Sequence, residues 1–289
     1  MLSIIIPTLN EEKYLPLLLE AIKKQNFNGD YEVIVADADS EDKTVELAKS
    51  YGCRVIPGGL PAKGRNEGAK VAQGDAFLFV DSDTVLSGYF LEKALKEFKE
   101  RNLDVAGFFL YPYQGNKFLK LLYNLFYNWW PALAGEKILP HASNTILVKK
   151  KLHQKLGGFD EEIKIGEDHA YAREAAKMGR FGIIRSLPIL VLTRRFECDG
   201  WLNTYFKYIL CELWMVFGKN IKSDIFEYRF DYSKEDKKIS KDSRGILKWL
   251  KLFFQVPRLA IKILIISVLW LITSLLSPPV LLIRSLFKK

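Results

Sequence analysis

The sequence predicts an α/β fold with a mostly parallel central sheet and helices on both of its faces. Short apolar runs alternate with helical patterns through the first 80 residues, and polar sequences follow three of these runs. A strand–helix alternation of this kind is typical of parallel sheets, which bind ligands at the carboxyl ends of their strands. The sequence therefore predicts both the layers of the fold and the edge where a site should lie.

The expected elements follow one another in order along the first part of the chain. The expected strands are Leu2–Ile6, Tyr31–Ala36, Arg54–Ile56 and Ala76–Val80. The expected helices are Leu15–Ile22, Lys43–Tyr51 and Asn66–Gln73. The last of these helices carries alanine and glycine, so we expect it to pack closely on the sheet.

The fourth expected strand is the most informative, because Asp81 and Asp83 follow its apolar residues 77–80. Alternation along an extended backbone places both carboxylates on one side, where both can reach one divalent cation. Mg²⁺ and Mn²⁺ typically take one or two carboxylates and complete their shell with water and phosphates. An acidic turn is the alternative for this motif alone. Polar sequences at two other strand ends, Pro7–Glu11 and Asp37–Ser40, converge with it and favour a site.

Nucleotide phosphates would need a cation and side chains here, because neither G-x-x-x-x-G-K-[ST] nor an early G-x-G-x-x-G is present. Lys63 and Arg65 are expected to open the helix before the fourth strand. Basic side chains and free backbone N–H groups at a helix start suit a diphosphate. A solvated basic helix start is an equally natural interpretation of these two residues.

An aromatic segment, Phe118–Trp130, is apolar on all sides. Such a segment is either part of the core or pressed against an apolar partner. The second possibility is a lid over a lipid-linked acceptor at a membrane interface, where Trp and Tyr are favoured.

The segment after it contains a second acidic motif. Thr145–Val148 is strand-like, and Gly157–Asp160 predicts a turn. Gly166 then opens a helix that begins with Glu167 and Asp168. These two acids are either favourable charges at a helix N-terminus or functional carboxylates.

The carboxyl-terminal segment 246–289 carries most of the net charge. It holds seven basic residues and no acid, which leaves +2 of the total +9 for residues 1–245. Ile263–Ile283 has no charge over 21 residues, about the length of a membrane-spanning helix. Pro278 and Pro279 should break or kink it, so a kinked span and a helix pair in one leaflet remain open. We expect membrane attachment rather than a buried helix, and no nucleic-acid binding.

The part of the chain before this segment is expected on the cytoplasmic side of the membrane. Met1–Ser3 runs straight into the first strand without the basic region of a signal peptide. Cys53, Cys198 and Cys211 are widely spaced without a C-x-x-C motif, which fits reduced thiols. The three histidines lack zinc-ligand spacing with them.

Taken together, these motifs resemble glycosyltransferase family 2, whose fold is GT-A. The segments that carry the resemblance are Ile4–Glu12, Val33–Asp37 with Ser40, Asp42 and Thr44, Gly64–Ala69, Ala72–Asp75, Asp81 and Asp83, Gly157–Asp160, Glu167–Asp168 with Arg173, Arg194–Phe196 and Gly200–Leu202. The resemblance covers about residues 2–200. It implies a catalytic domain at 1–200. The remaining sequence predicts a helical and polar connecting region at 201–245 and a membrane-attachment tail at 246–289.

The resemblance implies transfer of a sugar from a nucleoside-diphosphate donor to a hydroxyl or to a lipid-linked or glycan acceptor, with inversion and with Mg²⁺ or Mn²⁺. Asp83 would hold the metal, and Asp81 would contact the ribose or a metal-bound water. The residues expected to bind the donor are Pro7, Thr8, Asn10, Glu11, Asp37, Asp39, Lys63, Arg65 and Asp81. Asp168 is the expected general base, with Glu167 second. A lipid-phosphate acceptor would already be anionic and would need no base.

Two positions depart from the family pattern. Ala38 follows Asp37 where many members have Asp or Gly, which leaves open whether Asp37 or Asp39 contacts the nucleobase of the donor. His169 and Ala170 replace the apolar or acidic residues often found after Glu-Asp. A nucleotidyltransferase and a non-catalytic nucleotide-sugar binding module at a membrane surface are the alternative functions.

Overall fold

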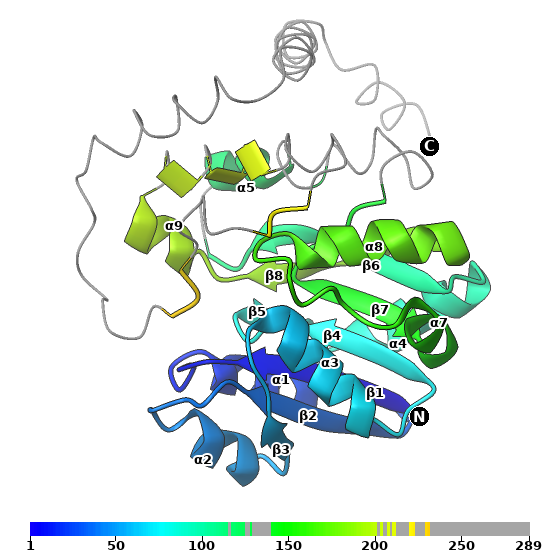
Figure 1. Cartoon of the computed structure of the whole chain (residues 1–289), viewed down its shortest axis with the longest axis horizontal. Helices are drawn as coiled ribbons and strands as arrows, with labels where there is room; N and C mark the ends of the chain where they lie inside the picture. The colour runs from blue at the N-terminus through cyan, green and yellow to red at the C-terminus, as the bar shows by residue number, and fades with distance from the viewer. Residues whose placement is uncertain are drawn as a thin grey trace, which may run out of the picture.

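The computed structural model describes residues 1–114, 117–124, 128, 140–200, 203–204, 207–208, 210–211, 220–222 and 229–231 (Figure 1). Its strands are β1 (Leu2–Thr8), β2 (Tyr31–Asp37), β3 (Arg54–Pro57), β4 (Ala76–Val80), β5 (Thr84–Val85), β6 (Val105–Pro112), β7 (Thr145–Lys149) and β8 (Phe181–Val191). Its helices are α1 (Leu15–Lys23), α2 (Thr44–Ser50), α3 (Pro61–Val71), α4 (Phe90–Glu100), α5 (Lys117–Tyr123), α7 (Lys150–Leu156), α8 (Glu167–Met178) and α9 (Arg194–Asp199).

The strands form one mixed sheet in the order β3-β2-β1-β4-β7-β6-β8-β5. Within the part β3-β2-β1-β4, each pair of neighbouring strands is parallel. β7 runs antiparallel between β4 and β6, β6 and β8 are parallel, and the short β5 is antiparallel to β8. The prediction of a mostly parallel α/β sheet is confirmed, with β7 and β5 as its antiparallel members.

The order of the strands reverses at β1, because β2 lies on one side of it and β4 on the other. In doubly wound sheets, helices leave opposite faces at such a point and open a crevice beyond the carboxyl ends of the two strands. Thr8 is the last residue of β1, and Asp81 follows the last residue of β4. The fold therefore brings the first polar loop and the acidic motif to one crevice.

Helices cover both faces of the sheet, as predicted. Buried residues of α1 and α4 pack against one face of β1 and β4. Buried residues of α3, α7 and α8 pack against the other face, which includes Ile5, Phe77 and Phe79. Figure 1 shows α3 over the part of the sheet that contains β1 and β4 and α8 over the part that contains β6, and the first turns of both helices line one cavity. The α3 and α8 N-termini are thus available to the same site.

Helix α3 lies close to β1 because of Gly68. A Cβ atom at this position would lie 2.3 Å from Cγ2 of Ile5, far inside van der Waals contact. The absence of a side chain lets the helix approach the sheet, as the alanine and glycine content of this segment predicted.

The predicted start of this helix at Asn66 is wrong, because α3 begins at Pro61. Proline at the first helical position has the required φ and no N–H that needs a partner. The N–H of Gly64 already donates to the Leu60 carbonyl at 2.9 Å, so it is not free to bind a phosphate. Lys63 and Arg65 consequently lie inside the helix and point in different directions, since residues two apart are about 200° apart around its axis.

The expected membrane tail, 246–289, and most of the connecting region 201–245 lie outside the described residues. Of the aromatic segment Phe118–Trp130, the structure describes the part in α5 together with Asn124 and Asn128. Among the residues that the structure describes, no helix has both the length and the apolar character needed to cross a bilayer.

Candidate active site

A cleft lies at the carboxyl ends of β1 and β4, where the strand order reverses. Its lining residues are Pro7, Thr8, Leu9, Glu11, Ala38, Gly59, Leu60, Pro61, Asp81, Ser82, Asp83, Arg194, Arg195 and Phe230. They come from both halves of the chain, so the cleft forms only in the folded protein. The structure thus brings the predicted acidic motif and the Pro7–Glu11 loop together.

Asp81 and Asp83 reach this cleft through a turn. The predicted extended backbone is wrong, because the Thr84 N–H donates to the Asp81 carbonyl at 3.1 Å and closes a turn after β4. The pairing of β5 with β8 then holds the residues that follow. Both aspartates nevertheless line the same cleft, which is what a shared cation requires.

Oδ1 of Asp83 is buried and has no hydrogen-bond partner within the described residues. A buried carboxylate oxygen is costly unless a hydrogen-bond donor or a cation meets it. This oxygen therefore fits a divalent metal. No cluster of three or more His, Cys, Asp or Glu residues that could hold a metal occurs in the described part of the chain. Two carboxylates together with a ligand's phosphates and water are nevertheless a usual shell for Mg²⁺ or Mn²⁺.

Arg65 lies beside Asp81, and its side chain is only 2% exposed. Its Nη2 donates to Oδ1 of Asp81 at 2.6 Å, and its Nη1 donates to Oε1 of Glu167 at 2.6 Å. Burial raises the pKa of Asp81, the Arg65 guanidinium opposes that shift, and the nearby Asp83 carboxylate adds to it. Burial likewise raises the pKa of Glu167, again against the effect of Arg65. The arginine is therefore shared by the two acidic motifs.

Glu167 and Asp168 begin α8, as predicted from the sequence. Gly166 precedes them with φ of 76°, a left-handed conformation that glycine adopts without strain. Oδ2 of Asp168 accepts the Asn144 N–H at 3.2 Å, and its Oδ1 accepts the His169 N–H at 2.8 Å. The candidate base is thus held by two backbone groups.

Two neutral histidines lie next to Asp168. The rings of His141 and His169 are stacked with their centroids 4.0 Å apart. Burial, together with the charge of Arg173, lowers the pKa of His169 to about 3. Burial and the neighbouring His169 lower the pKa of His141 well below its usual value. The departure from the family pattern at His169 therefore adds an uncharged ring beside the base, and His141 is a site residue that the sequence analysis missed.

The residues predicted to hold a nucleoside divide into two groups. Pro7, Thr8 and Glu11 line the cleft. Asp37 instead forms hydrogen bonds with neighbouring residues of the protein. Its carboxylate accepts the Thr8 hydroxyl at 2.8 Å, and it accepts the N–H and the hydroxyl of Ser40 at 2.8 and 2.6 Å. It holds the β1 and β2 loops together.

Asn10 and Asp39 both have a left-handed backbone, with φ of 54° and 59°. The Asn10 side-chain amide donates to Asp231 at 2.9 Å, which ties the first loop to the segment 229–231. Asp39 is exposed and is not among the residues that line the cleft. The structure thus brings Asp37, rather than Asp39, into contact with the cleft residue Thr8.

Arg194 and Arg195 are cleft residues to which the sequence analysis gave no role. Arg194 donates to both carboxylate oxygens of Glu11, at 3.0 and 2.8 Å, and stacks over Tyr14. Arg195 donates to the Tyr208 hydroxyl at 2.8 Å. The position of Arg194 after β8 gave no hint of its proximity to Glu11, which is 183 residues away. The resemblance at Arg194–Phe196 was the only signal for them.

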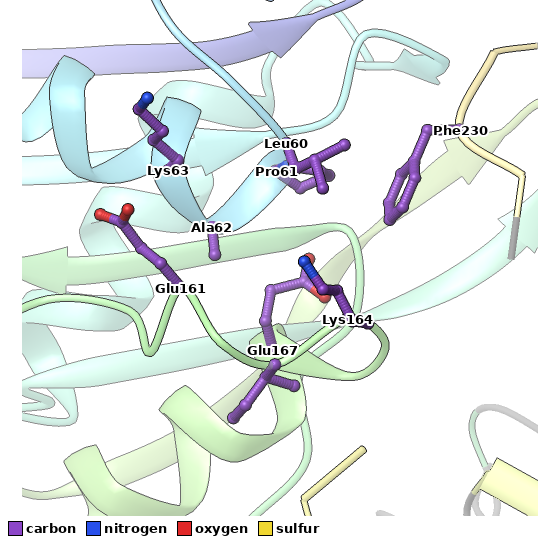
Figure 2. Close-up of a pocket in the computed structure, with 9 residues that line it drawn as sticks. Leu60, Pro61, Ala62, Lys63, Glu161, Lys164, Glu167 and Phe230 are labelled. Carbon is purple, nitrogen blue, oxygen red and sulfur yellow. The ribbon is translucent and has the colours of Figure 1, made fainter. Parts of the chain in front are cut away.

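Lys63 lines a second cavity, of about 200 Å³, next to the cleft (Figure 2). The two share Leu60, Pro61 and Phe230. Figure 2 shows Leu60 and Pro61 on one side of this cavity and Lys164 and Glu167 on the other. Lys63 and Arg65, predicted as one phosphate site, are therefore separated.

Comparison with known proteins finds relatives among bacterial glycosyltransferases. The poly(ribitol-phosphate) beta-N-acetylglucosaminyltransferase TarS of Staphylococcus aureus is 30% identical over 206 residues, which are 67% of this chain and 35% of that protein. An uncharacterized glycosyltransferase of Haemophilus influenzae is 29% identical over 182 residues, 59% of this chain and 60% of that protein. The chain thus spans about a third of the length of TarS.

Solved structures show the same fold. The crystal structure of S. aureus TarS 1-349 in complex with UDP-GlcNAc matches with a TM-score of 0.57 and 23% identity, covering 90% of this chain and 82% of that chain. The mannosyltransferase PcManGT from Pyrobaculum calidifontis, in complex with GDP-Man and Mn²⁺, matches with a TM-score of 0.58 and 17% identity, covering 77% and 65%. At these identities the likeness concerns the fold, and it confirms a GT-A-like arrangement.

The family itself follows from the sequence comparison. The family model described as glycosyl transferase family 2 matches residues 3–177, more than half of the chain. The matched segment contains the Pro7–Glu11 loop, Asp81, Asp83 and the Glu167–Asp168 pair whose geometry is described above. The chain therefore belongs to glycosyltransferase family 2.

Proposed function

We propose that the protein transfers a sugar from a nucleoside-diphosphate donor to an acceptor hydroxyl, with inversion and with Mg²⁺ or Mn²⁺ bound by Asp81 and Asp83. The observation that carries the proposal is the buried Asp83 Oδ1, which meets no donor within the described residues and lies in a cleft lined by the Pro7–Glu11 loop. Membership of glycosyltransferase family 2 supports it. UDP-GlcNAc, bound by a structural neighbour, is the first donor to test.

On the donor side, the cleft gathers charges that suit a diphosphate. A bound metal would neutralise the charge that develops on the leaving diphosphate. Asp83 and Asp81 would hold it. Arg194 and Arg195 line the same cleft and can donate charge-assisted hydrogen bonds to phosphate oxygens, Arg194 in exchange for its bonds to Glu11. These groups favour departure of the nucleoside diphosphate.

On the acceptor side, Asp168 removes the proton of the attacking hydroxyl. The Asn144 and His169 N–H groups orient its two oxygens. The stacked His141 and His169 are neutral, so they add no charge beside this carboxylate. A positioned general base contributes about a hundred- to ten-thousand-fold in rate.

The acceptor is proposed to reach the site through the cavity that Glu167 lines. Lys63 and Lys164 line this cavity together with Glu161 and Glu167, and the two lysines can bind an anionic acceptor, such as a polyol phosphate or a lipid-linked phosphate. The relative TarS is described as acting on poly(ribitol-phosphate), which supports this class. Competition between poly(ribitol phosphate) and a neutral glycan for the transferred sugar would test it, and preference for the glycan would contradict it.

The reaction is tested with the full chain and a panel of UDP- and GDP-sugars, with Mn²⁺, Mg²⁺ or EDTA and with mass detection of the products. We expect at least one donor to release its nucleoside diphosphate in the presence of metal. A ligand at a hundred times its Kd should also add about 2.7 kcal/mol of stability. If no donor is cleaved, transferred or stabilising, the proposal is wrong.

The same panel separates the alternative functions. Release of inorganic diphosphate would identify a nucleotidyltransferase. Stabilisation by a nucleotide sugar without turnover would identify a binding module. Neither alternative has an observation in its favour beyond the cleft that all three functions share.

We also propose that the segment 246–289 attaches the protein to a membrane with the catalytic domain on the cytoplasmic side. The seven basic residues and the uncharged run Ile263–Ile283 motivate this. Flotation of the full chain with anionic liposomes should succeed and resist a high-salt wash. Recovery of all the protein at the bottom of the gradient would contradict the proposal.

A further inference from the structure

The Arg65 guanidinium joins the two acidic motifs of the site. Its two Nη atoms donate to different carboxylates, Nη1 to Glu167 and Nη2 to Asp81, each at 2.6 Å. The side chain is 2% exposed. The donors that face these carboxylates are therefore occupied, and a phosphate could take one of them only by displacing a carboxylate.

A second connection runs through the backbone of Asn144. Its carbonyl accepts the Asp81 N–H at 3.1 Å, and its N–H donates to Oδ2 of Asp168 at 3.2 Å. Asn144 has φ of 58°, a left-handed conformation that asparagine tolerates better than most residues. The Arg65 side chain thus connects Asp81 to Glu167, and the backbone of Asn144 connects Asp81 to Asp168.

The surroundings hold Arg65 in this place. Its guanidinium lies over the Phe159 ring, 5.3 Å from the centroid, and that ring stacks on Tyr171 of α8 at 4.0 Å. The next residue of α3 is Asn66. Its Oδ1 accepts the Phe159 N–H at 2.8 Å, and its Nδ2 donates to the Phe159 carbonyl at 2.9 Å. Helix α3 therefore holds both the loop before α8 and the first carboxylate of α8.

We propose that Arg65 is a positioning residue that couples the Asp81 end of the metal site to the Glu167–Asp168 pair, and that it is not a ligand of the diphosphate. The inference rests on the proposed sugar transfer. A single arginine then sets Asp81 and the first turn of α8 at once, so the alignment of the metal site with the base depends on one side chain. This assigns Arg65 a role different from the phosphate contact expected from the sequence.

The test uses the full chain with Arg65→Lys, which keeps the charge but cannot donate to both carboxylates in the same fork geometry. We expect kcat for transfer from UDP-GlcNAc to fall about a hundredfold, because a 1 Å displacement of catalytic groups costs about that much. The KM for UDP-GlcNAc and the Kd for UDP in EDTA should stay within about twofold. A tenfold or larger loss of UDP affinity in EDTA would show that Arg65 binds the diphosphate and would overturn the proposal.

A control separates positioning from a general effect on the helix. Lys70 also lies on α3 and forms an exposed pair with Glu67, so Lys70→Gln should leave kcat and KM unchanged. For the backbone connection, Asn144→Gly keeps access to the left-handed conformation whereas Asn144→Ala does not. We expect the alanine variant to lose more kcat than the glycine variant, and equal losses would argue against this connection.

A double-mutant cycle tests the coupling whether or not sugar transfer is found. Asp81→Asn and Glu167→Gln touch Arg65 from its two sides, so their effects on Tm should be non-additive by about 2–4 °C. Additive shifts would overturn the coupling. Inactivity of the wild type with every donor would instead count against the proposed function, so the two failures are distinguishable.

Discussion

The proposed site has a donor half, which contains Asp81 and Asp83, and an acceptor half, which contains Glu167 and Asp168. The two halves are built differently. In the donor half, the strands β1 to β4 are parallel, and the polar ends of β1, β2 and β4 lie on one edge of the sheet, as the sequence predicts. In the acceptor half, β7 runs antiparallel and Asp168 sits at the start of α8, held by Asn144 and, through its neighbour Glu167, by Arg65. Arg65 is 102 residues from Glu167. Local pattern thus specifies the donor half, whereas long-range contacts specify the acceptor half.

The largest effect is expected in the donor half, from Asp83→Asn. Removing this charge should abolish metal-dependent donor binding and lower transfer about a thousandfold, because charge stabilisation at the leaving group is lost. The measurements are Mn²⁺ binding in the presence of UDP and steady-state transfer.

Asp75→Asn is the matched control. It is the same substitution at the opposite end of β4, at a side chain that is 92% exposed. It should leave both measurements unchanged. Normal metal dependence in Asp83→Asn would remove the basis for the donor half as a metal site.

The next effect is expected in the acceptor half, from Asp168→Asn. Loss of the base should lower kcat about a hundred- to ten-thousand-fold while donor KM is kept. Asp160→Asn, an exposed neighbour in the loop before α8, is the control and should be neutral. A change of less than about threefold in Asp168→Asn would indicate that the attacking oxygen of the acceptor is already anionic, as in a lipid phosphate, so this variant sharpens the identity of the acceptor.

A smaller effect is expected where the halves meet, at His153 of α7. Its ring packs on Phe77 and Phe79 of β4 and shares a hydrogen bond with the Tyr171 hydroxyl of α8 at 2.8 Å. Burial lowers the pKa of His153 to about 4. Below about pH 6.5 the unfolded chain binds a proton that the folded protein does not, so stability falls as the pH drops from 6.5 to 4.

The difference between these pKa values corresponds to about 3 kcal/mol. Urea unfolding at pH 7 and pH 4.5 should therefore show a smaller loss of stability in His153→Gln than in the wild type. Lys155→Gln, at an exposed position of the same helix, should keep the wild-type loss. If His153→Gln keeps it too, this histidine does not contribute to the acid sensitivity.

The smallest effect is expected from Gly68→Ala, within the packing of the donor half. The new methyl group would lie 2.3 Å from Ile5 Cγ2, and such overpacking typically costs about 1–3 kcal/mol. Thermal unfolding measures the loss, with Lys70→Ala on the exposed face of α3 as the control. A Gly68→Ala variant as stable as the wild type would mean that α3 can shift away from β1 at little cost.

Much of the donor half could be predicted because its signals are local. Residues 77–80 are buried on both faces, as an uninterrupted apolar run predicts, and the polar sequences after β1 and β4 meet because parallel strands end on the same edge. The start of α8 at Glu167 and Asp168 was also predicted, because a glycine followed by two acids is typical of a helix start, whereas their acceptor-side role was expected from the family resemblance.

The errors arose where a side chain's direction depends on the packing of an element. Lys63 and Arg65 are close in sequence and both basic, so they were assigned to one phosphate site. Because α3 begins at Pro61, one of them lines the neighbouring cavity and the other is buried between two carboxylates. Arg194 was given no role, because nothing in its local sequence indicates that it pairs with Glu11.

The sequence by itself determined the α/β class, the parallel order of the first strands and the acidic residues at their ends, because backbone periodicity and strand-end geometry act over a few residues. The tertiary structure decided which charges meet: Arg65 with Asp81 and Glu167, Arg194 with Glu11, and Asn144 with Asp168. The physical reason is that a buried charge needs a partner within hydrogen-bond distance, and only the packing of distant elements determines which partner is within reach.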